Sequence, residues 1–137
     1  MVDVLSAVKA IIQDGDKFLL IKTLYKGKTF WDLPGGKIVY GENPHDTLHR
    51  EIKEETGLDV DIINPMGVWW FFRIVDKKQV VCNTFLCKPK HTNVDTTKNP
   101  SNEENIQEFR WVTKDEFLSD EYDTTGYESL KELISRL

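Results

Sequence analysis

Three glutamates in the middle of the chain are spaced so that they could bind one metal ion. Glu51, Glu54 and Glu55 fall at positions i, i+3 and i+4, so on an α-helix their side chains share one face within about one turn. Like charges at this spacing repel each other by a few tenths of a kcal/mol per pair, and the helix dipole disfavours acids near a helix C-terminus. A hard divalent cation such as Mg²⁺, which prefers oxygen ligands, would offset both penalties.

Taken alone, this triplet allows two interpretations. A glutamate-rich helix face is more often a solvated surface than a metal site, because glutamate is mostly found exposed. Arg50 lies four residues before Glu54, and a side-chain pair at that spacing can orient the carboxylate. The neighbouring residues are therefore needed to distinguish a solvated helix face from a metal-binding site.

The segment that contains the triplet is predicted to form a helix. Asn43 is suited to the N-cap and Pro44 to the first helical position. The helix should run to about Thr56, since Gly57 can adopt the left-handed conformation that ends helices. The glutamates therefore lie in its last two turns.

The preceding residues are predicted to form a hairpin and a loop. Residues 8–12 and 18–21 are apolar runs on either side of Asp14-Gly15, a pair typical of hairpin turns. Residues 31–36 contain one proline and two glycines, so we expect a loop or bulge there.

The remaining residues predict strands and a C-terminal helix. Residues 68–75 and 80–87 are rich in β-branched and aromatic side chains and read as two strands, and residues 109–112 as a short third one. The polar stretch 88–105 between them is predicted to be a functional or mobile loop. Apolar residues at helical spacing in 130–137 predict an amphipathic helix that packs on the sheet. Strands around one or two helices give an α+β or α/β sandwich.

The complete pattern around the triplet resembles that of a known family. It consists of Gly36, five residues, Glu42, seven residues and then the run from Arg50 to Leu58. This stretch, residues 36–58, resembles the Nudix box, in which G, E, REU, EE and GU stand at fixed spacing and U is aliphatic. Every fixed position is filled, with Ile52 and Leu58 at the aliphatic sites. The chain is therefore identified as a member of the Nudix hydrolase family, MutT-like in size.

The resemblance implies a fold, an activity and a set of site residues. The expected fold is the α/β Nudix sandwich, α/β/α with a mixed β-sheet and a loop-helix-loop catalytic motif, as a single domain over residues 1–137. Family members hydrolyse a nucleoside diphosphate linked to another moiety, using Mg²⁺ or Mn²⁺. The residues that match the family's metal ligands are Glu51, Glu54, Glu55 and the carbonyl of Gly35 or Gly36; Glu42 and Gly57 match motif positions that support the loop and helix, and Arg50 is expected to orient Glu54.

Chemistry agrees with this implication. Water that attacks a phosphorus atom of a diphosphate requires charge neutralisation on the oxygens and a nucleophile formed at neutral pH. Metal ions can supply both, and a nearby carboxylate can take the proton. In some members the residue that matches Glu51 activates the water, and we keep Glu51 and Glu54 as catalytic candidates.

Further site residues are expected besides the fixed positions of the box. The family often completes its metal site with a glutamate from a later loop, and the candidates are Glu103, Glu104 and Glu108, of which we favour Glu104. Lys37 and Trp31 are expected to contact the substrate. Five lysines that precede the helix could meet phosphates, although scattered lysines are normally solvated: Lys9, Lys22, Lys26, Lys28 and Lys37.

The substrate is predicted only by class. We expect a (deoxy)nucleoside triphosphate or an oxidised nucleotide, cleaved to the monophosphate and pyrophosphate. ADP-ribose or another nucleoside diphosphate sugar is the alternative, although the proline that marks many ADP-ribose hydrolases downstream of the box is absent, since residues 72–74 occupy that area. A non-catalytic nucleotide-binding module is a further alternative, but such domains often lose box carboxylates.

Composition limits the partners. The formal net charge of −5 makes duplex nucleic acid an unexpected partner, since clustered cations drive that binding. The longest apolar run, residues 68–72, is far too short to span a membrane. The four aromatic residues in it alternate between strand faces, so one pair should be core, while the other could stack on a base or pack in a homodimer.

The cysteines and the N-terminus favour a cytoplasmic protein. Cys82 and Cys87 are separated by an odd number of positions, so on one strand they point to opposite faces and should not form a disulfide. Residues 1–10 lack an apolar core, and we expect no signal peptide.

Overall fold

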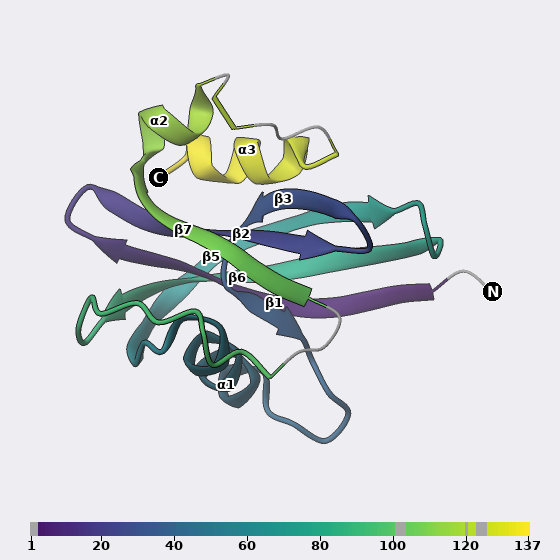
Figure 1. Cartoon of the computed structure of the whole chain (residues 1–137), viewed down its shortest axis with the longest axis horizontal. Coiled ribbons are helices and arrows are strands. Elements are labelled where there is room, and N and C mark those ends of the chain that lie inside the picture. The colour runs from purple at the N-terminus through teal and green to yellow at the C-terminus, as the bar shows by residue number, and fades with distance from the viewer. Residues whose placement is uncertain (1–2, 101–103, 120, 123–125) are drawn as a thin grey trace.

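The N-terminal segment forms the central strand because its apolar residues can be buried on both sides. In the computed structural model, which describes residues 3–100, 104–119, 121–122 and 126–137, residues 7–12 of strand β1 (Asp3–Asp14) are all buried. A strand buried on both faces needs a layer of structure on each side. The helices supply those layers (Figure 1).

The sheet is mixed, as the family resemblance implied. Strand β1 pairs in parallel with β6 (Lys78–Pro89) and antiparallel with the short β4 (Gly35–Lys37). Strand β5 (Val60–Arg73) pairs antiparallel with β6 and forms an edge. The end of β1 turns into β2 (Lys17–Tyr25), which lies between β3 (Lys28–Asp32) and β7 (Glu104–Thr113).

Helices cover the two faces, which makes the molecule an α/β/α sandwich (Figure 1). Helix α1 (Pro44–Thr56) lies on one face, and helices α2 (Lys114–Leu118) and α3 (Glu128–Ser135) lie on the other. Alternate residues of β1 serve the two cores: Ala7 and Ile11 pack on the α2–α3 side, and Val8 and Ile12 on the α1 side. Because side chains alternate along a strand, the Lys9 side chain lies on the same side as Ala7 and Ile11, the α2–α3 side.

The predicted helix is confirmed with its ends. The Asn43 side chain accepts a hydrogen bond from the His45 N–H at 2.8 Å, and Pro44 begins α1. Gly57 follows Thr56 with φ 74°, and its N–H donates to the Lys53 carbonyl. A left-handed residue at this position is favourable for glycine because it has no Cβ.

The prediction of a loop over residues 31–36 is wrong in its extent. Trp31 and Asp32 end β3, Gly35 and Gly36 begin β4, and only two residues lie between these strands. The glycines permit pairing rather than prevent it, because a Cβ on Gly35 would collide with the Val8 carbonyl oxygen of β1. This close approach places the start of the Nudix-like segment directly on the central strand.

The three later strands differ from their predicted bounds. Strand β6 extends two residues further at each end, and β5 ends at Arg73, so residues 74 and 75, predicted as strand, lie in a turn. Strand β5 begins at Val60 and continues through two irregularities near Pro65, and β7 begins at Glu104. The pairing with neighbouring strands extends both segments through residues of low strand propensity. Residues 91–100 lack regular structure, which confirms most of the predicted polar loop.

The C-terminal helix is confirmed, and it also contacts a sheet edge. Leu130, Leu133 and Ile134 of α3 are buried against the sheet. The Ser129 hydroxyl accepts a hydrogen bond from the Trp70 N–H at 2.9 Å and donates one to the Trp70 carbonyl at 2.8 Å. Within the part of the chain that the structure describes, no helix is long and apolar enough to cross a bilayer.

The two cysteines lie on opposite faces of β6, as predicted. Cys82 belongs to the core under α2 and α3, Cys87 to the core under α1, and both are free thiols. Burial raises the pKa of each thiol to about 12.

We expect that denatured protein, prepared without reductant, will titrate two thiols per chain with Ellman's reagent. The native protein should react far more slowly at pH 8, because few of the buried thiols are ionised and only thiolates are nucleophilic. A count of zero in denatured monomer would contradict the assignment.

Candidate active site

Arg50 holds three carboxylates around the start and the middle of α1. Its Nε and Nη2 each donate to one Glu42 oxygen at 3.0 Å. Its Nη1 reaches Glu51 at 3.2 Å and Glu54 at 3.3 Å. The hydrogen bonds from Arg50 and from the Thr47 hydroxyl lower the pKa of Glu42 to about 2, and the contact with Glu42 raises the pKa of Arg50. The guanidinium therefore fixes the loop before the helix and offsets the predicted repulsion between Glu51 and Glu54.

The other two motif contacts join the helix to the start of β4. The buried Glu55 accepts a hydrogen bond from the Gly35 N–H at 2.7 Å. The Glu51 carboxylate lies against Gly36, where a Cβ would come within 2.5 Å of the Glu51 Cδ. The absence of a side chain at Gly36 therefore lets the Glu51 carboxylate approach β4, while Glu55 reaches the same strand through the Gly35 N–H.

These residues fit a Mg²⁺ or Mn²⁺ ion by their chemistry. The donors are carboxylate and backbone oxygens, which hard cations prefer, and Mg²⁺ is commonly held by one or two carboxylates together with water and substrate phosphates. Across the described residues, no three histidine, cysteine or acidic side chains are close enough to hold a metal by themselves. Glu51, Glu54 and Glu55, with the carbonyl of Gly35 or Gly36, remain the groups that would hold the ion. Glu51 and Glu54 meet at one Arg50 nitrogen, and Glu55 accepts the Gly35 N–H through Oε1.

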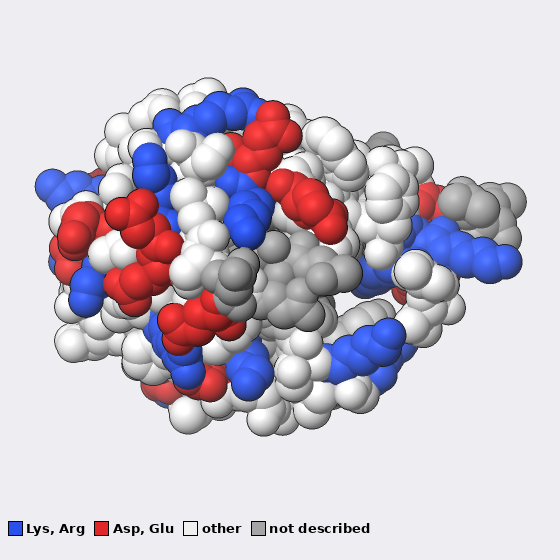
Figure 2. All heavy atoms as spheres, turned by 90° about the horizontal axis from the view of Figure 1, so that it is seen from above, with Lys and Arg blue, Asp and Glu red and all other residues white. Residues whose placement is uncertain are grey.

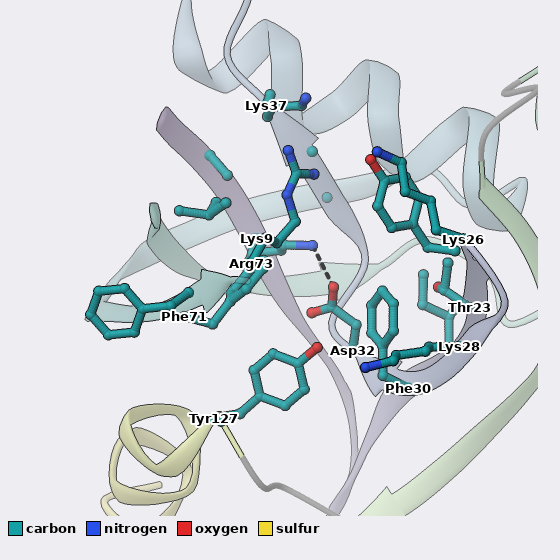
Figure 3. A pocket seen from close by; sticks show the side chains of 18 of the residues that line it. Lys9, Thr23, Lys26, Lys28, Phe30, Asp32, Lys37, Phe71, Arg73 and Tyr127 are labelled. Atoms are coloured by element: carbon teal, nitrogen blue, oxygen red, sulfur yellow. Dashed lines mark hydrogen bonds and ion pairs between the residues drawn. The ribbon is translucent and has the colours of Figure 1, made fainter. Parts of the chain in front are cut away.

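A cavity of about 300 Å³ opens beside the motif (Figure 3). The motif contributes Gly35, Gly36 and Glu55 to its lining. The cavity is rich in cations although the chain is acidic, since five basic side chains line it: Lys9, Lys26, Lys28, Lys37 and Arg73. Acidic and basic side chains are instead interspersed on the outer face seen in Figure 2. The positive electrostatic potential that would attract a polyanion is therefore concentrated inside the cavity.

Aromatic rings line the same cavity. Tyr127 lies 5.3 Å from Phe71 and 6.2 Å from Phe30 between ring centroids. Arg73 lies over the Tyr25 ring at 5.4 Å. In Figure 3, Phe30 and Tyr127 lie at the end of the cavity opposite Lys37. The cavity therefore has Lys37 near the motif, and Phe30 and Tyr127, with Lys28 beside Phe30, at the opposite end.

A buried ion pair joins β1 to the end of β3 in this cavity. The Lys9 ammonium donates to Asp32 Oδ2 at 2.9 Å and to the Leu33 carbonyl at 3.3 Å, and Asp32 Oδ1 accepts from the Leu33 N–H at 2.7 Å. The two side chains are 9% and 10% exposed. Burial has the largest single effect on the pKa of Lys9 and lowers it, but the charge of Asp32, with smaller contributions from Cys82, Glu55 and the hydrogen bond to Asp32, raises that pKa overall. The sequence did not predict a role for Asp32. The one sign of the Lys9–Asp32 ion pair was the presence of Lys9 in an otherwise apolar strand.

The family is now established by comparison. A family model described as the NUDIX domain matches residues 4–134. The chain belongs to the Nudix family.

An uncharacterised Nudix hydrolase of Bacillus subtilis, YvcI, is 43% identical over 63 residues, which are 44% of this chain and 37% of that protein. An RNA pyrophosphohydrolase of Francisella tularensis is 31% identical over 102 residues, covering 64% of each protein. The matches thus span less than two thirds of the curated relatives' length.

Solved structures share the Nudix fold. The MutT protein of Methanosarcina mazei superposes with a TM-score of 0.80 at 22% identity, over 98% of this chain and 93% of that one. A UDP-X diphosphatase superposes with a TM-score of 0.70 at 25% identity, over 96% of this chain and 61% of that one. The α/β/α sandwich described above is therefore the Nudix sandwich.

The residues expected to contact the substrate lie in different places. Lys37 lines the cavity. Trp31 does not; its ring packs on Tyr122 at 5.5 Å on the α2 side and lies under the Arg110 guanidinium at 5.0 Å. Of the five lysines, all but Lys22 line the cavity.

The three glutamates proposed to complete the Nudix metal site differ in how far the structure describes them and in where they lie. Glu103 and the side chain of Glu104 lie outside the described residues. The backbone of Glu104 begins β7 instead of ending a loop, and it pairs with Tyr25, which lines the cavity. Glu108 forms an exposed ion pair with Arg110 at 2.9 Å.

Proposed function

We propose that this Nudix protein is a divalent-metal-dependent pyrophosphohydrolase whose preferred substrates are nucleoside triphosphates, including oxidised forms, cleaved to the monophosphate and pyrophosphate. The observation that carries the proposal is the position of the complete Nudix box beside a cavity lined by five cations and by aromatic rings. Cations match a chain of phosphates, and aromatic faces match a nucleobase. The proposal takes residues 1–137 as one catalytic domain.

The residues of the chain have distinct roles in the proposed reaction. A bound Mg²⁺ or Mn²⁺ would neutralise charge on the diphosphate and make water a better nucleophile. Arg50 keeps the Glu51 and Glu54 side chains oriented, and one of their carboxylate oxygens takes the proton from the attacking water. Glu55 fixes the start of β4 through the Gly35 N–H, so that the backbone carbonyls there keep their direction. Lys37 and Arg73 stabilise negative charge on the phosphates from the cavity wall.

A nucleoside diphosphate sugar is the second candidate substrate. The fold likeness to a UDP-X diphosphatase favours it, as does an ADP-ribose pyrophosphatase of Streptococcus suis among the structural neighbours. The full set of box carboxylates favours an enzyme over a binding module.

A nucleotide panel assayed with Mg²⁺ and with Mn²⁺ tests the proposal. We expect release of pyrophosphate from triphosphates, measured with and without a coupled pyrophosphatase, and no turnover in excess EDTA. Preferential cleavage of ADP-ribose or UDP-glucose would select the second candidate. No turnover of any compound with either metal would contradict both and favour a binding module.

Glu104 is the residue that we propose to complete the metal site. We expect Glu104→Gln to lower kcat far more than it raises KM, because an interaction made mainly in the transition state affects turnover. Glu103→Gln and Glu108→Gln are the matched variants, and Glu108→Gln should change kcat little because that side chain pairs with Arg110. If none of the three variants changes kcat by more than a few-fold, the site is completed by water and substrate alone.

A further inference from the structure

One face of the sheet is left open at the end where β1 begins. Strands β1, β6 and β5 lie side by side there, and Ala7, Cys82 and Trp69 pack from them into the core under α2 and α3. Because side chains alternate along a strand, the residues next to these three along each strand point to the α1 side. Helix α1 packs on that side with Val8 and Ile12, farther along β1. No helix in the described part of the chain covers the end where β1 begins (Figure 1).

Apolar side chains form this open sheet face. They come from three paired strands and are, in order along the chain, Val4, Val68, Trp70, Phe72 and Val81. The register makes them neighbours, since Trp70 lies opposite Val81, and Val4 and Phe72 lie opposite the same residue of β6. All of them except Val81 are exposed. A contiguous exposed apolar patch of a few hundred Å² typically marks an interaction site.

The open sheet face carries no charged side chain, although 30% of the residues in the chain are charged. The other three positions on it are Ser6, Gln79 and Asn83, and the Asn83 amide donates to the Ser6 hydroxyl at 3.1 Å. A partner that is selected by charge, such as nucleic acid or an anionic membrane, would find no complementary group on this face. An uncharged apolar face is instead complementary to a second copy of itself, because two-fold symmetry then brings no like charges together.

The open sheet face is large enough to form the centre of a stable interface. Trp70 is 45% and Phe72 65% exposed, and an aromatic side chain can bury about 150–250 Å². Together with the three valines, docking would bury on the order of 400 Å² of apolar surface per copy. A standard interface buries about 800 Å² per partner, of which somewhat more than half is apolar. The face supplies most of that apolar part, and Glu128 and Glu132 of α3, which border Trp70, add polar groups at its rim.

We propose that the open sheet face binds the same face of a second copy of this chain, which makes the protein a two-fold symmetric dimer of sheets packed face to face. Trp70 is expected at the centre of the contact, because tryptophan is enriched among the residues that contribute most to such interfaces. The cavity beside the Nudix box is lined from the opposite side of the same strands, for example by Lys9 and Phe71. Both cavities therefore stay open in the dimer, and the inference goes beyond the proposed function without depending on it.

Sedimentation velocity of the full chain at about 1 to 100 µM tests the proposal in the affinity range of modest interfaces. We expect the mass of two chains at the upper end of this range. The dimer should be at least as stable in about 1 M NaCl as in about 0.15 M NaCl, because salt screens ion pairs but does not weaken apolar contacts. Trp70→Lys and Val68→Lys should each raise the dimer Kd, by about 30-fold or more for Trp70→Lys, since each places a charge in the apolar contact.

The matched control is Ile63→Lys, which adds the same charge at another exposed apolar residue of β5, outside the open sheet face. It should dimerise with the wild-type Kd. A wild-type protein that is monomeric over the whole range, or a wild-type Kd for both Trp70→Lys and Val68→Lys, would overturn the proposal. Binding of monomeric protein to phosphatidylcholine vesicles that is lost in Trp70→Lys would overturn it too and assign the face to lipid. The mass of the wild-type protein needs no variant, so a variant that fails to fold leaves the proposal testable.

Discussion

Replacing Glu54 with glutamine is expected to lower kcat by about 100- to 10,000-fold, the range typical for loss of a positioned acid–base group. The change keeps the shape of the side chain but removes the negative charge that we propose to bind metal or take the proton. Because Glu54 contacts Arg50 at 3.3 Å, we expect no gain in stability from relieved repulsion, in contrast to what three free carboxylates would give. Steady-state kinetics at saturating Mg²⁺, combined with thermal unfolding, measures both effects.

The matched control is Glu132→Gln on α3. That residue forms a similar i, i+4 ion pair with Arg136 at 3.1 Å, on the exposed surface of a different helix. It should leave kcat unchanged. Turnover near the wild-type level for Glu54→Gln at saturating metal would remove Glu54 from the proposed mechanism.

The second large effect is expected on stability. Lys9→Met should lower the free energy of unfolding by about 3–5 kcal/mol, because it leaves the Asp32 carboxylate buried with no countercharge. Both side chains are 10% exposed or less, so water screens the pair weakly. Urea unfolding followed by tryptophan fluorescence measures the change.

A double variant shows whether the loss comes from the unpaired charge. Lys9→Met with Asp32→Leu replaces the pair by apolar groups, which is often close to neutral for buried ion pairs. It should recover most of the lost stability. A loss below about 1 kcal/mol for Lys9→Met alone would mean that Asp32 is hydrated or protonated, contrary to the geometry described here.

Local sequence rules predicted the helix that carries the motif. Asn43, Pro44 and Gly57 each have a conformational preference that acts within a few residues, so the ends of α1 could be placed without tertiary information. The same holds for the opposite orientation of Cys82 and Cys87, which follows from the two-residue period of a strand. The mixed sandwich was predicted from the family resemblance and not from such rules.

Contacts between distant residues could not be predicted in this way. Lys9 and Asp32 are 23 positions apart and meet only because β1, β2 and β3 lie in one sheet. Spacing alone made Glu55 equivalent to Glu51 and Glu54, yet the approach of β4 gives Glu55 the Gly35 N–H as a partner. The start of β7 at Glu104 depends likewise on a partner strand, β2, which supplies Tyr25 opposite it.

The hydroxyl of Ser129 has a consequence for self-association. Strand β5 is at the edge of the sheet, and an edge strand offers unpaired backbone groups that can recruit a strand from another molecule. The exposed Trp70 and Phe72 would make such pairing more favourable by covering apolar surface. By occupying both the N–H and the carbonyl of Trp70, Ser129 replaces the hydrogen bonds that an incoming strand would need near the C-terminal end of this edge. One residue of α3 thus opposes pairing between this edge and a strand of another molecule.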